Sequence, residues 1–363
     1  MNLSSFKKYT ILVAPLDWGL GHATRCIPII RALLNNSHKV VIAAEGAQLI
    51  LLKQEFPKVK FIELRGYRVK YSKSDYFFSL KLIAQIPGII KTIYKENRWL
   101  KQIVEDEKID LVIADNRYGL YHNTIPSIFI THQLTIKAPF KWLEQMIQSI
   151  NYKFINRFKG CWVPDIEGTP NVGGVLSHPS KMPATPIQYI NLLSRFEINL
   201  SVQKYDLCIL LSGPEPQRSV LEEKILQSIA TINATILLVR GKPESNQLIT
   251  VPSNVTVVNH LSTHLLGEAI QQSEFILSRS GYTTIMELLV LKKKMILIPT
   301  PSQTEQEYLA KNLMKQQFAI TASQDDVDFV NLLHQAKAFE YKTISVKQFD
   351  EHNIDQLIQN VVS

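Results

Sequence analysis

Residues 278–287, Ser-Arg-Ser-Gly-Tyr-Thr-Thr-Ile-Met-Glu, decide the fold of the second half of this 363-residue chain. The stretch follows the apolar run 275–277 and leads into the apolar-periodic run 285–291. This order predicts a buried strand, a tight turn at Gly281 and then a helix. The unpaired backbone N–H groups at the start of such a helix attract an anion.

The side chains around this turn suggest what the anion belongs to. Glu287 comes three residues after Thr284, so both lie on one face of the predicted helix. A phosphate at the helix start would leave this carboxylate one turn deeper, where it can bind a vicinal diol. A nucleotide sugar offers both groups. The candidate donor-binding residues here are Arg279, Ser280, Gly281, Thr283, Thr284 and Glu287.

Length and composition limit the class of protein. A chain of 363 residues is expected to form two domains, and 45% apolar with 20% charged residues is typical of a soluble globular protein. We find no signal peptide and no run near the ~18 apolar residues of a spanning helix. Three scattered cysteines, Cys26, Cys161 and Cys208, favour reduced thiols in a cytoplasmic protein and argue against a zinc site.

Positive charge is concentrated in one segment. The net charge is +8, and residues 65–101 hold nine Lys or Arg against two Asp or Glu, together with many aromatic residues. Such a segment could contact anionic lipid headgroups on the inner face of the cytoplasmic membrane, or an anionic acceptor. The reading we favour is one or two amphipathic helices whose apolar side is core. No nucleic-acid-binding motif accompanies the charge.

Strand and helix patterns alternate in both halves of the chain. Strands are predicted at 10–16, 39–44, 60–64, 111–114, 127–130, 207–211, 236–239, 255–258, 275–277 and 295–298. Helices are predicted at 23–34, 46–53, 76–104, 222–232, 265–272, 285–291 and 305–315. The alternation predicts two Rossmann-like α/β domains with parallel sheets, facing across a cleft. We expect domains at 1–185 and 205–340, a linker at 186–204 after a Pro- and Gly-rich passage, and a helical tail at 341–363 that packs back on the first domain.

A second motif follows the first predicted strand. Gly19-x-Gly21 allows a tight turn before a helix, and His22 stands at that helix start. A dinucleotide site would show the same turn with Glu45 as ribose ligand, but Thr24 replaces the third glycine, so an NAD site is disfavoured. The helix dipole favours neutral His22, which can then act as a general base. The alternative is that His22 only caps the helix or donates to a phosphate.

Asp115 closes the fourth predicted strand and is the candidate partner of His22. A carboxylate at that strand end could hold the tautomer of the imidazole. It could equally cap the next element, which is the more common role of a strand-end Asp. His132 and Gln133 follow the next strand and face the same edge.

Further polar residues follow strands of the second half. Arg218 shares the loop after residue 211, and Asp326-x-Asp328 is expected to cap a helix without binding metal. The ends of successive parallel strands meet at one edge of the sheet. The polar residues that follow these strands therefore suggest a ligand site at that edge. The candidates for phosphate are Ser212, Gly213 and Arg240, and those for sugar hydroxyls are Gln303, Gln306 and Glu307.

The second half resembles the nucleotide-sugar domain of the peptidoglycan UDP-GlcNAc transferases, which are family 28-like glycosyltransferases of the GT-B fold. The resemblance covers most of 207–318 in order, and its specific part is 278–308. It implies that Ser280, Gly281 and Thr284 serve the diphosphate, that Glu287 holds the ribose and that Gln306 contacts the donor sugar. The glycine-rich phosphate loop of the family is here Ser-Gly-Pro-Glu-Pro at 212–216, which is a departure.

The first half resembles a different enzyme of the same fold. Gly21-His22-x-x-Arg25-Cys26 is similar to a stretch of the UDP-sugar hydrolase of pseudaminic acid synthesis, in which the His activates water. We therefore list Gly21 with the donor-binding candidates and His22 and Asp115 as the catalytic candidates.

These features predict an inverting transfer of a hexosyl group from a UDP-sugar to an acceptor hydroxyl, in cell-envelope or glycolipid and polysaccharide synthesis. UDP-sugar would be a co-substrate, and neither a cofactor nor a metal is expected. The acceptor is open, and the basic aromatic segment suggests a lipid-linked one. The alternatives are a UDP-sugar hydrolase of the same fold and a non-catalytic nucleotide-sugar-binding protein.

Overall fold

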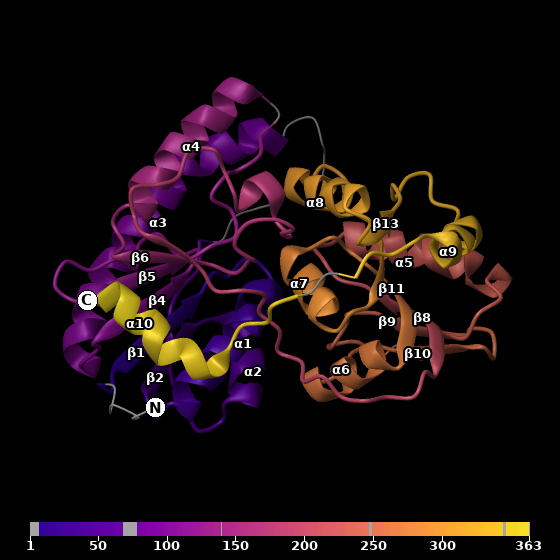
Figure 1. The fold of residues 1–363 in the computed structure, drawn as a ribbon, viewed down its shortest axis with the longest axis horizontal. Coiled ribbons are helices and arrows are strands. Elements are labelled where there is room, and N and C mark those ends of the chain that lie inside the picture. Colours follow the sequence, from indigo (N-terminus) through magenta and orange to yellow (C-terminus); the bar gives the residue numbers. More distant parts are fainter. Residues whose placement is uncertain (1–6, 68–77, 139, 247–248, 344–345, 363) are drawn as a thin grey trace. The chain divides into compact units, whose positions relative to one another are not determined.

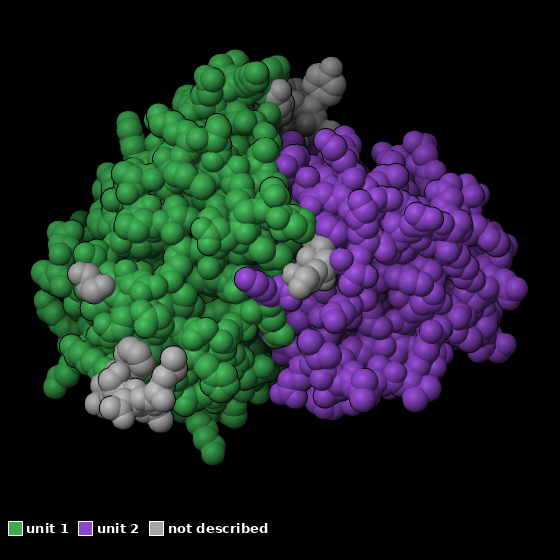
Figure 2. Space-filling view, in the orientation of Figure 1, with its two compact units in different colours: residues 1–193, 348–363 green, residues 194–347 purple. Residues whose placement is uncertain are grey.

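The computed structural model describes residues 7–67, 78–138, 140–246, 249–343 and 346–362, with the backbone alone for 78–86 (Figure 1). The chain divides into two compact units. Unit 1 comprises Met1–Leu193 and Gln348–Ser363, and unit 2 comprises Ser194–Lys347 (Figure 2). Each unit is built around its own parallel sheet.

The sheet of unit 1 has seven strands in the described part of the chain, all paired in parallel. Their order is β3-β2-β1-β4-β5-β6-β7. Apart from the edge strands β3 and β7, the strands are almost fully buried, because helices cover both faces of such a sheet. The strands are β1 (Thr10–Pro15), β2 (Lys39–Ala44), β3 (Lys60–Glu63), β4 (Leu111–Asp115), β5 (Ser127–Ile130), β6 (Gly160–Val163) and β7 (Ile187–Tyr189).

The helices of unit 1 are α1 (Leu20–Asn35), α2 (Gly46–Glu55), α3 (Phe78–Glu107), α4 (Lys141–Ile155) and α10 (Ile354–Val362). Helix α1 begins directly after a glycine turn, where Gly19 has φ 79°, a value that favours glycine. The last helix, α10, packs on α1 although it comes from the chain end (yellow in Figure 1). Asp355 on α10 accepts from His38 Nε2 at 2.6 Å and from Lys8 Nζ at 3.2 Å, which ties the chain end to unit 1.

The sheet of unit 2 has six strands in the described residues, again all parallel, in the order β10-β9-β8-β11-β12-β13. Its strands are β8 (Tyr205–Leu210), β9 (Ile236–Val239), β10 (Val255–Val258), β11 (Ser273–Ser278), β12 (Lys294–Leu297) and β13 (Ala319–Thr321). Its helices are α5 (Gln217–Ser228), α6 (Thr263–Gln271), α7 (Tyr282–Val290), α8 (Thr304–Lys315) and α9 (Phe329–Ala338). Asp328 caps α9 by accepting from the N–H groups of Val330 and Asn331, as predicted.

Two parallel-sheet α/β units are confirmed, and the predicted strands and helices appear within a few residues of their expected bounds. The prediction omitted α4, β6, β7 and β13, three of them strands of three or four residues. Because β7 pairs with β6, residues 187–189 belong to the sheet of unit 1 and not to the linker expected at 186–204. The chain passes from unit 1 to unit 2 between Leu193 and Ser194, and residues 341–347 stay with unit 2.

The strand orders locate the ligand edge of each sheet. In unit 1 the order of the strands reverses between β1 and β4, and in unit 2 it reverses between β8 and β11. In open parallel sheets, ligands bind outside the carboxyl ends of the strands at such a reversal. His22 follows β1 and Asp115 ends β4, while Gly213 follows β8 and Gly281 follows β11. The predicted residues therefore gather at the reversal point of each sheet.

Within the described ranges, no helix is both long enough and apolar enough to cross a membrane.

Candidate functional site

His22 and Asp115 meet at the reversal point of the first sheet. Asp115 is the last residue of β4 and pairs in register with Pro15 at the end of β1. It is fully buried, and His22 projects toward it from the first turn of α1. His22 Nδ1 lies 3.3 Å from Asp115 Oδ2. The fold thus brings together the two residues that the sequence analysis singled out for catalysis.

Arg25 is the residue at this point whose role the sequence analysis did not foresee. Its Nε donates to Asp115 Oδ2 at 2.7 Å, and its Nη2 donates to the other carboxylate oxygen. Its Nη1 lies 2.9 Å from His132 Nδ1, and the whole side chain is buried. Helical spacing was the available signal, because Arg25 is one turn after His22 and so shares its face.

Burial and charge set the protonation of this cluster. Burial alone would raise the pKa of Asp115, but the charges of Arg25 and His22 outweigh it and hold that pKa well below its usual range. Burial, and then the charge of Arg25, lower the pKa of His22, and Asp115 offsets this only in part. At neutral pH the cluster therefore holds a carboxylate, a guanidinium and a neutral imidazole.

The proton of neutral His22 is placed by its neighbours. His22 Nδ1 is 2.8 Å from Arg25 Nη2, closer than its 3.3 Å separation from Asp115 Oδ2. A guanidinium can only donate, so in this arrangement Nδ1 accepts and Nε2 carries the proton. A base acting through Nε2 needs the other tautomer, with Nδ1–H donating to Asp115.

The turn after β11 has room for a side chain at its glycine. Gly281 is the N-cap residue of α7, and a side chain there would meet no atom within 4 Å. Thr283 and Thr284 in the first turn are half-buried. Ser280 lies before the cap and is fully buried, and its hydroxyl donates to the carbonyl of Gln306 at 2.8 Å. A diphosphate contact of the Ser280 hydroxyl stays a prediction, and it requires that the hydroxyl first leave Gln306.

Glu287 lies one turn deeper on α7 and is paired with Arg195, which the sequence analysis did not single out. Only 5% of Glu287 is exposed, and Arg195 Nε is 3.0 Å from its Oε1. Burial raises the pKa of Glu287, and the charge of Arg195 opposes that rise without cancelling it. Arg195 lies in the segment expected to be a linker, where the sequence carries no motif.

Two arginines expected at the ligand edge are used inside unit 2. Arg279 is buried and donates to the carbonyls of Ile298, Pro299 and Gln217, and burial lowers its pKa to about 10. Arg240 forms a buried ion pair with Glu222, to which Arg218 also donates at 3.2 Å. The structure thus places both guanidinium groups within the unit and not at an open edge.

The remaining candidates of unit 2 shape two loops. Gly213 is exposed with φ 101°, a conformation that L side chains rarely adopt. After β12, Gln306 Oε1 accepts from the N–H of Thr300 at 2.9 Å, and Glu307 Oε1 accepts from the N–H of Ser302 at 3.1 Å. Gln306 also donates to Gln303, so these side chains hold the loop in which they lie. Ser212 is exposed beside Gly213, and Gly21 is half-buried in the first turn of α1.

Two expectations concern the basic aromatic segment and the need for a metal. Residues 68–77 of the basic aromatic segment lie outside the described residues, as do the side chains of 78–86, so membrane contact stays a prediction. Among the residues the structure describes, no three His, Cys, Asp or Glu side chains are grouped to hold a metal. The expectation that no metal or cofactor is required also stays a prediction.

Comparison with known proteins agrees with this fold. Residues 217–352, which include most of unit 2, match the model of the glycosyltransferase family 28 C-terminal domain. The fold and this domain define the class that the chain resembles: its fold is that of the GT-B glycosyltransferases, and its second unit is similar to the family 28 C-terminal domain. The resemblance to family 28 that the residues of α7 indicated is thereby confirmed.

The chain is similar to an uncharacterized glycosyltransferase of the archaeon Methanosarcina acetivorans, with 19% identity over 322 residues, 80% of this chain and 79% of that protein. The fold of the kitacinnamycin glycosyltransferase is similar at a TM-score of 0.65 and 14% identity, covering 98% of this chain and 100% of the other. The fold of MurG of Acinetobacter baumannii is similar at a TM-score of 0.57 and 13% identity, and the match covers 98% of this chain and 100% of MurG. The fold of the glycosyltransferase VinC, solved in complex with dTDP, is similar at a TM-score of 0.58 and 12% identity. The match covers 97% of this chain and 98% of VinC.

Proposed function

We propose that this protein moves a hexosyl group from a UDP-sugar to an acceptor hydroxyl, with inversion at the anomeric carbon. The observation that carries the proposal is the contact of neutral His22 with buried Asp115 at the reversal point of the first sheet. An imidazole backed by a carboxylate can accept the proton of a hydroxyl as that hydroxyl attacks the sugar.

The donor would bind to unit 2. The N–H groups at the start of α7, where Gly281 is the N-cap residue, would bind the diphosphate and would also stabilise the charge that grows on the UDP leaving group. Glu287 would hold the ribose diol, sharing its carboxylate with Arg195. The resemblance to the UDP-GlcNAc transferases supports uridine as the base. VinC, with dTDP bound, makes thymidine diphosphate sugars the necessary comparison in any assay.

The base role makes a specific demand on His22. Its Nδ1 must carry the proton and donate to Asp115 Oδ2, so that Nε2 can take the acceptor proton. The present 3.3 Å separation is long for this bond, and hydrogen bonds of catalytic groups often tighten only when substrate binds. Transfer therefore requires that the Arg25 contact to Nδ1 be loosened in the ternary complex.

Hydrolysis is the second candidate, and one observation favours it. His22, Arg25 and Cys26, the three side chains of the hydrolase-like stretch, all contact Asp115, with Cys26 Sγ at 3.7 Å from Oδ2. The same base would then activate water in place of an acceptor hydroxyl. A cell-envelope or glycolipid role follows only if an acceptor of that kind is identified.

Incubation of the protein with UDP- and dTDP-sugars, with and without an acceptor mixture, tests these readings. Transfer predicts a glycoside product that depends on acceptor, and hydrolysis predicts stoichiometric free sugar without it. His22→Ala should abolish either turnover and leave UDP affinity within about twofold, whereas His264→Ala, an exposed His on α6, should change neither. Tight nucleotide-sugar binding with no turnover in the unaltered protein would instead indicate a binding protein and contradict the proposal.

A further inference from the structure

Thr300, in the loop after β12, carries a buried hydroxyl that no part of the proposed mechanism uses. Only 2% of the residue is exposed, and its Oγ1 forms no hydrogen bond with any residue that the structure describes. Its backbone groups are both paired: the N–H donates to Gln306 Oε1 at 2.9 Å, and the carbonyl accepts from the N–H of Gln303 at 3.1 Å. A buried hydroxyl without a protein partner is costly, so this group indicates that a water or a ligand supplies its partner.

Thr300 lies at the same sheet edge as the turn before α7. Strand β12 pairs with β11, and the N–H of Ile298 donates to the carbonyl of Ser278 at 2.9 Å. Thr300 and Ser280 each follow this pair by two residues, so both leave the sheet at the same edge. Gln306 contacts both of them, because its carbonyl accepts from the Ser280 hydroxyl at 2.8 Å. Thr300 is therefore part of the loops proposed to hold the donor.

The Thr300 hydroxyl also lies beside the glycine turn after β8. Gly213 has φ 101°, and a Cβ on this residue would lie 3.9 Å from Thr300 Oγ1. Apart from the chain neighbours of Gly213, no other atom of the described residues would lie within 4 Å of that Cβ. The hydroxyl thus borders the room that a side chain at Gly213 would occupy.

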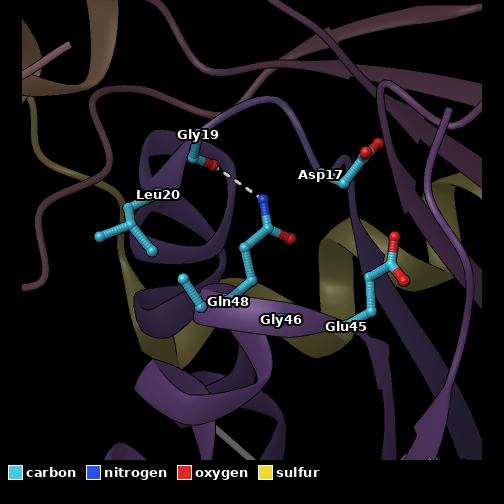
Figure 3. Close-up of a pocket in the computed structure, with 7 residues that line it drawn as sticks. Asp17, Gly19, Leu20, Glu45, Gly46 and Gln48 are labelled. Carbon is cyan, nitrogen blue, oxygen red and sulfur yellow. Dashed lines mark hydrogen bonds between the residues drawn. The ribbon is translucent and has the colours of Figure 1, made fainter. Parts of the chain in front are cut away.

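The turn at Gly213 differs from the corresponding turn of unit 1 in how its backbone is paired. In unit 1, the N–H of Gly19 donates to the carbonyl of Asp17 at 3.1 Å, and Gln48 donates to the carbonyl of Gly19 at 2.8 Å (Figure 3). In unit 2, no residue that the structure describes forms a hydrogen bond with the backbone of Ser212 or Gly213. Successive N–H groups in a turn can bind an anion, so the donors of this turn are available to one.

The loop after β8 supplies few donors of its own. Its sequence, Ser-Gly-Pro-Glu-Pro at 212–216, includes two prolines without a backbone N–H, so it offers fewer donors than a glycine-rich phosphate loop. Its carboxylate, Glu215, accepts from Arg218 Nε at 2.8 Å, so the negative charge of the loop is balanced. The Thr300 hydroxyl adds a donor from a neighbouring loop. Together with the two N–H groups of the turn, it matches the acceptor oxygens of a phosphate.

We propose that the Thr300 hydroxyl donates to a diphosphate oxygen of the bound nucleotide sugar, beside the turn at Gly213, and so helps to position the leaving group. The inference rests on the proposed donor site of unit 2 and adds a residue to that site. Because the hydroxyl has no partner among the described residues, its removal should weaken diphosphate binding without weakening the fold. This combination separates a binding role from a structural one.

The test compares Thr300→Val with the unaltered full-length protein by titration calorimetry, with UDP and dTDP as probes. Val keeps the branched shape of Thr and removes the hydroxyl. Hydrogen bonds to charged groups are strong, so the variant should bind the preferred nucleoside diphosphate about tenfold or more weakly. Its Tm without nucleotide should be equal or higher, because the substitution removes an unpaired buried hydroxyl.

Two further variants serve as controls. Thr300→Ser keeps the hydroxyl and should retain most of the affinity for the nucleoside diphosphate. The matched control is Thr235→Val, just before β9 and so at the opposite end of the sheet. The Thr235 hydroxyl donates to Asp206 Oδ2 at 2.7 Å, so this variant should lower the Tm and leave nucleotide affinity unchanged.

The inference is overturned if Thr300→Val binds UDP and dTDP as tightly as the unaltered protein does. It is also overturned if Thr300→Val loses affinity and Tm together, which would indicate a structural role. A Thr300→Ser variant as weak as Thr300→Val would show that the methyl group matters and not the hydroxyl, with the same consequence. An unaltered protein that binds neither UDP nor dTDP would contradict the proposed function itself, and the inference would fall with it.

Discussion

Arg25 and Asp115 form a buried salt bridge in which the guanidinium donates to both oxygens of the carboxylate. The Arg25 guanidinium also contacts Nδ1 of His22 and Nδ1 of His132. The side chain proposed as base is therefore part of a charge-balanced cluster and not of a simple pair.

Removing the charge of Asp115 should destabilise the fold as well as the reaction. Asp115→Asn leaves the buried Arg25 uncompensated, and breaking a buried pair in this way costs about 3–5 kcal/mol. We expect a loss of that size in the free energy of unfolding at pH 7, measured by urea denaturation. Because the folded pKa of Asp115 is depressed, its contribution is complete above the unfolded pKa of about 3.9 and is lost as the pH falls toward the folded value.

The difference between the unaltered protein and Asp115→Asn should therefore shrink below about pH 4. Arg25→Lys is the companion variant. It keeps the charge but loses the fork that reaches both oxygens, so stability should fall less than in Asp115→Asn. A difference that stays constant down to pH 3 would argue that the pKa of Asp115 is not depressed in the folded protein.

His38 should make the attachment of α10 sensitive to mild acid. His38 Nδ1 accepts from the N–H of Tyr9 at 3.2 Å, and its Nε2 donates to Asp355, so the neutral ring satisfies both partners. Burial lowers the pKa of His38, and Asp355 opposes this. Because the folded pKa of His38 is depressed, its contribution to stability is present above the unfolded pKa of about 6.5. That contribution is lost as the pH falls through the folded pKa.

Hydrogen exchange of the peptide that spans α10 measures this effect. Protection of residues 354–362 should fall between pH 7.5 and pH 5, after correction for the intrinsic exchange rate. Asp355→Asn should lower protection already at pH 7.5, since it weakens the contacts of both His38 and Lys8. Equal corrected protection at the two pH values would remove His38 from this role.

The contribution of Glu287 to stability should change with pH in the opposite direction from the contributions of Asp115 and His38. Burial raises its folded pKa above the unfolded value of about 4.3, so folding favours the protonated form. The associated stability is present at low pH and is lost as the pH rises through the folded pKa. Relative to Glu287→Gln, which cannot titrate, the unaltered protein should lose stability from about pH 4 upward until the side chain is ionised.

Arg195→Met should enlarge this change, because it removes the charge that opposes the rise in the Glu287 pKa. Urea denaturation of the three proteins between pH 4 and pH 8 provides the measurement. The same variants should bind UDP more weakly at pH 7 if Glu287 holds the ribose. Parallel stability curves for all three proteins would show that Glu287 does not titrate with a raised pKa.

Arg279 should matter for folding more than for donor binding. Arg279→Met leaves the carbonyls of Ile298, Pro299 and Gln217 without this donor. Each buried acceptor left unpaired costs about 1–3 kcal/mol, so the apparent Tm should fall by several degrees. Thermal unfolding with and without saturating UDP separates the two roles. A large loss of UDP affinity at unchanged Tm would restore Arg279 as a donor-binding residue.

Much of the fold could be predicted because its signals are local. Runs such as 39–44, 127–130, 236–239 and 255–258 are β-branched and apolar, and the structure has strands at these bounds. The strands that were missed, β6, β7 and β13, are three or four residues long, and β7 lies in a passage with many turn residues. Such short strands are stable only because a neighbouring strand pairs with them, and the local sequence does not show which strand that is.

The sequence by itself determined the two parallel sheets and the turn at Gly281, and it placed His22 and Asp115 each after a strand, because strand periodicity and strand ends can be recognised from consecutive residues. Only the tertiary structure decided what surrounds those groups. Arg25 reaches Asp115 across 90 positions, and Arg195 meets Glu287 from a segment that has no motif. Burial and the charge of a distant neighbour set whether a side chain holds a proton, and both depend on which parts of the chain pack together.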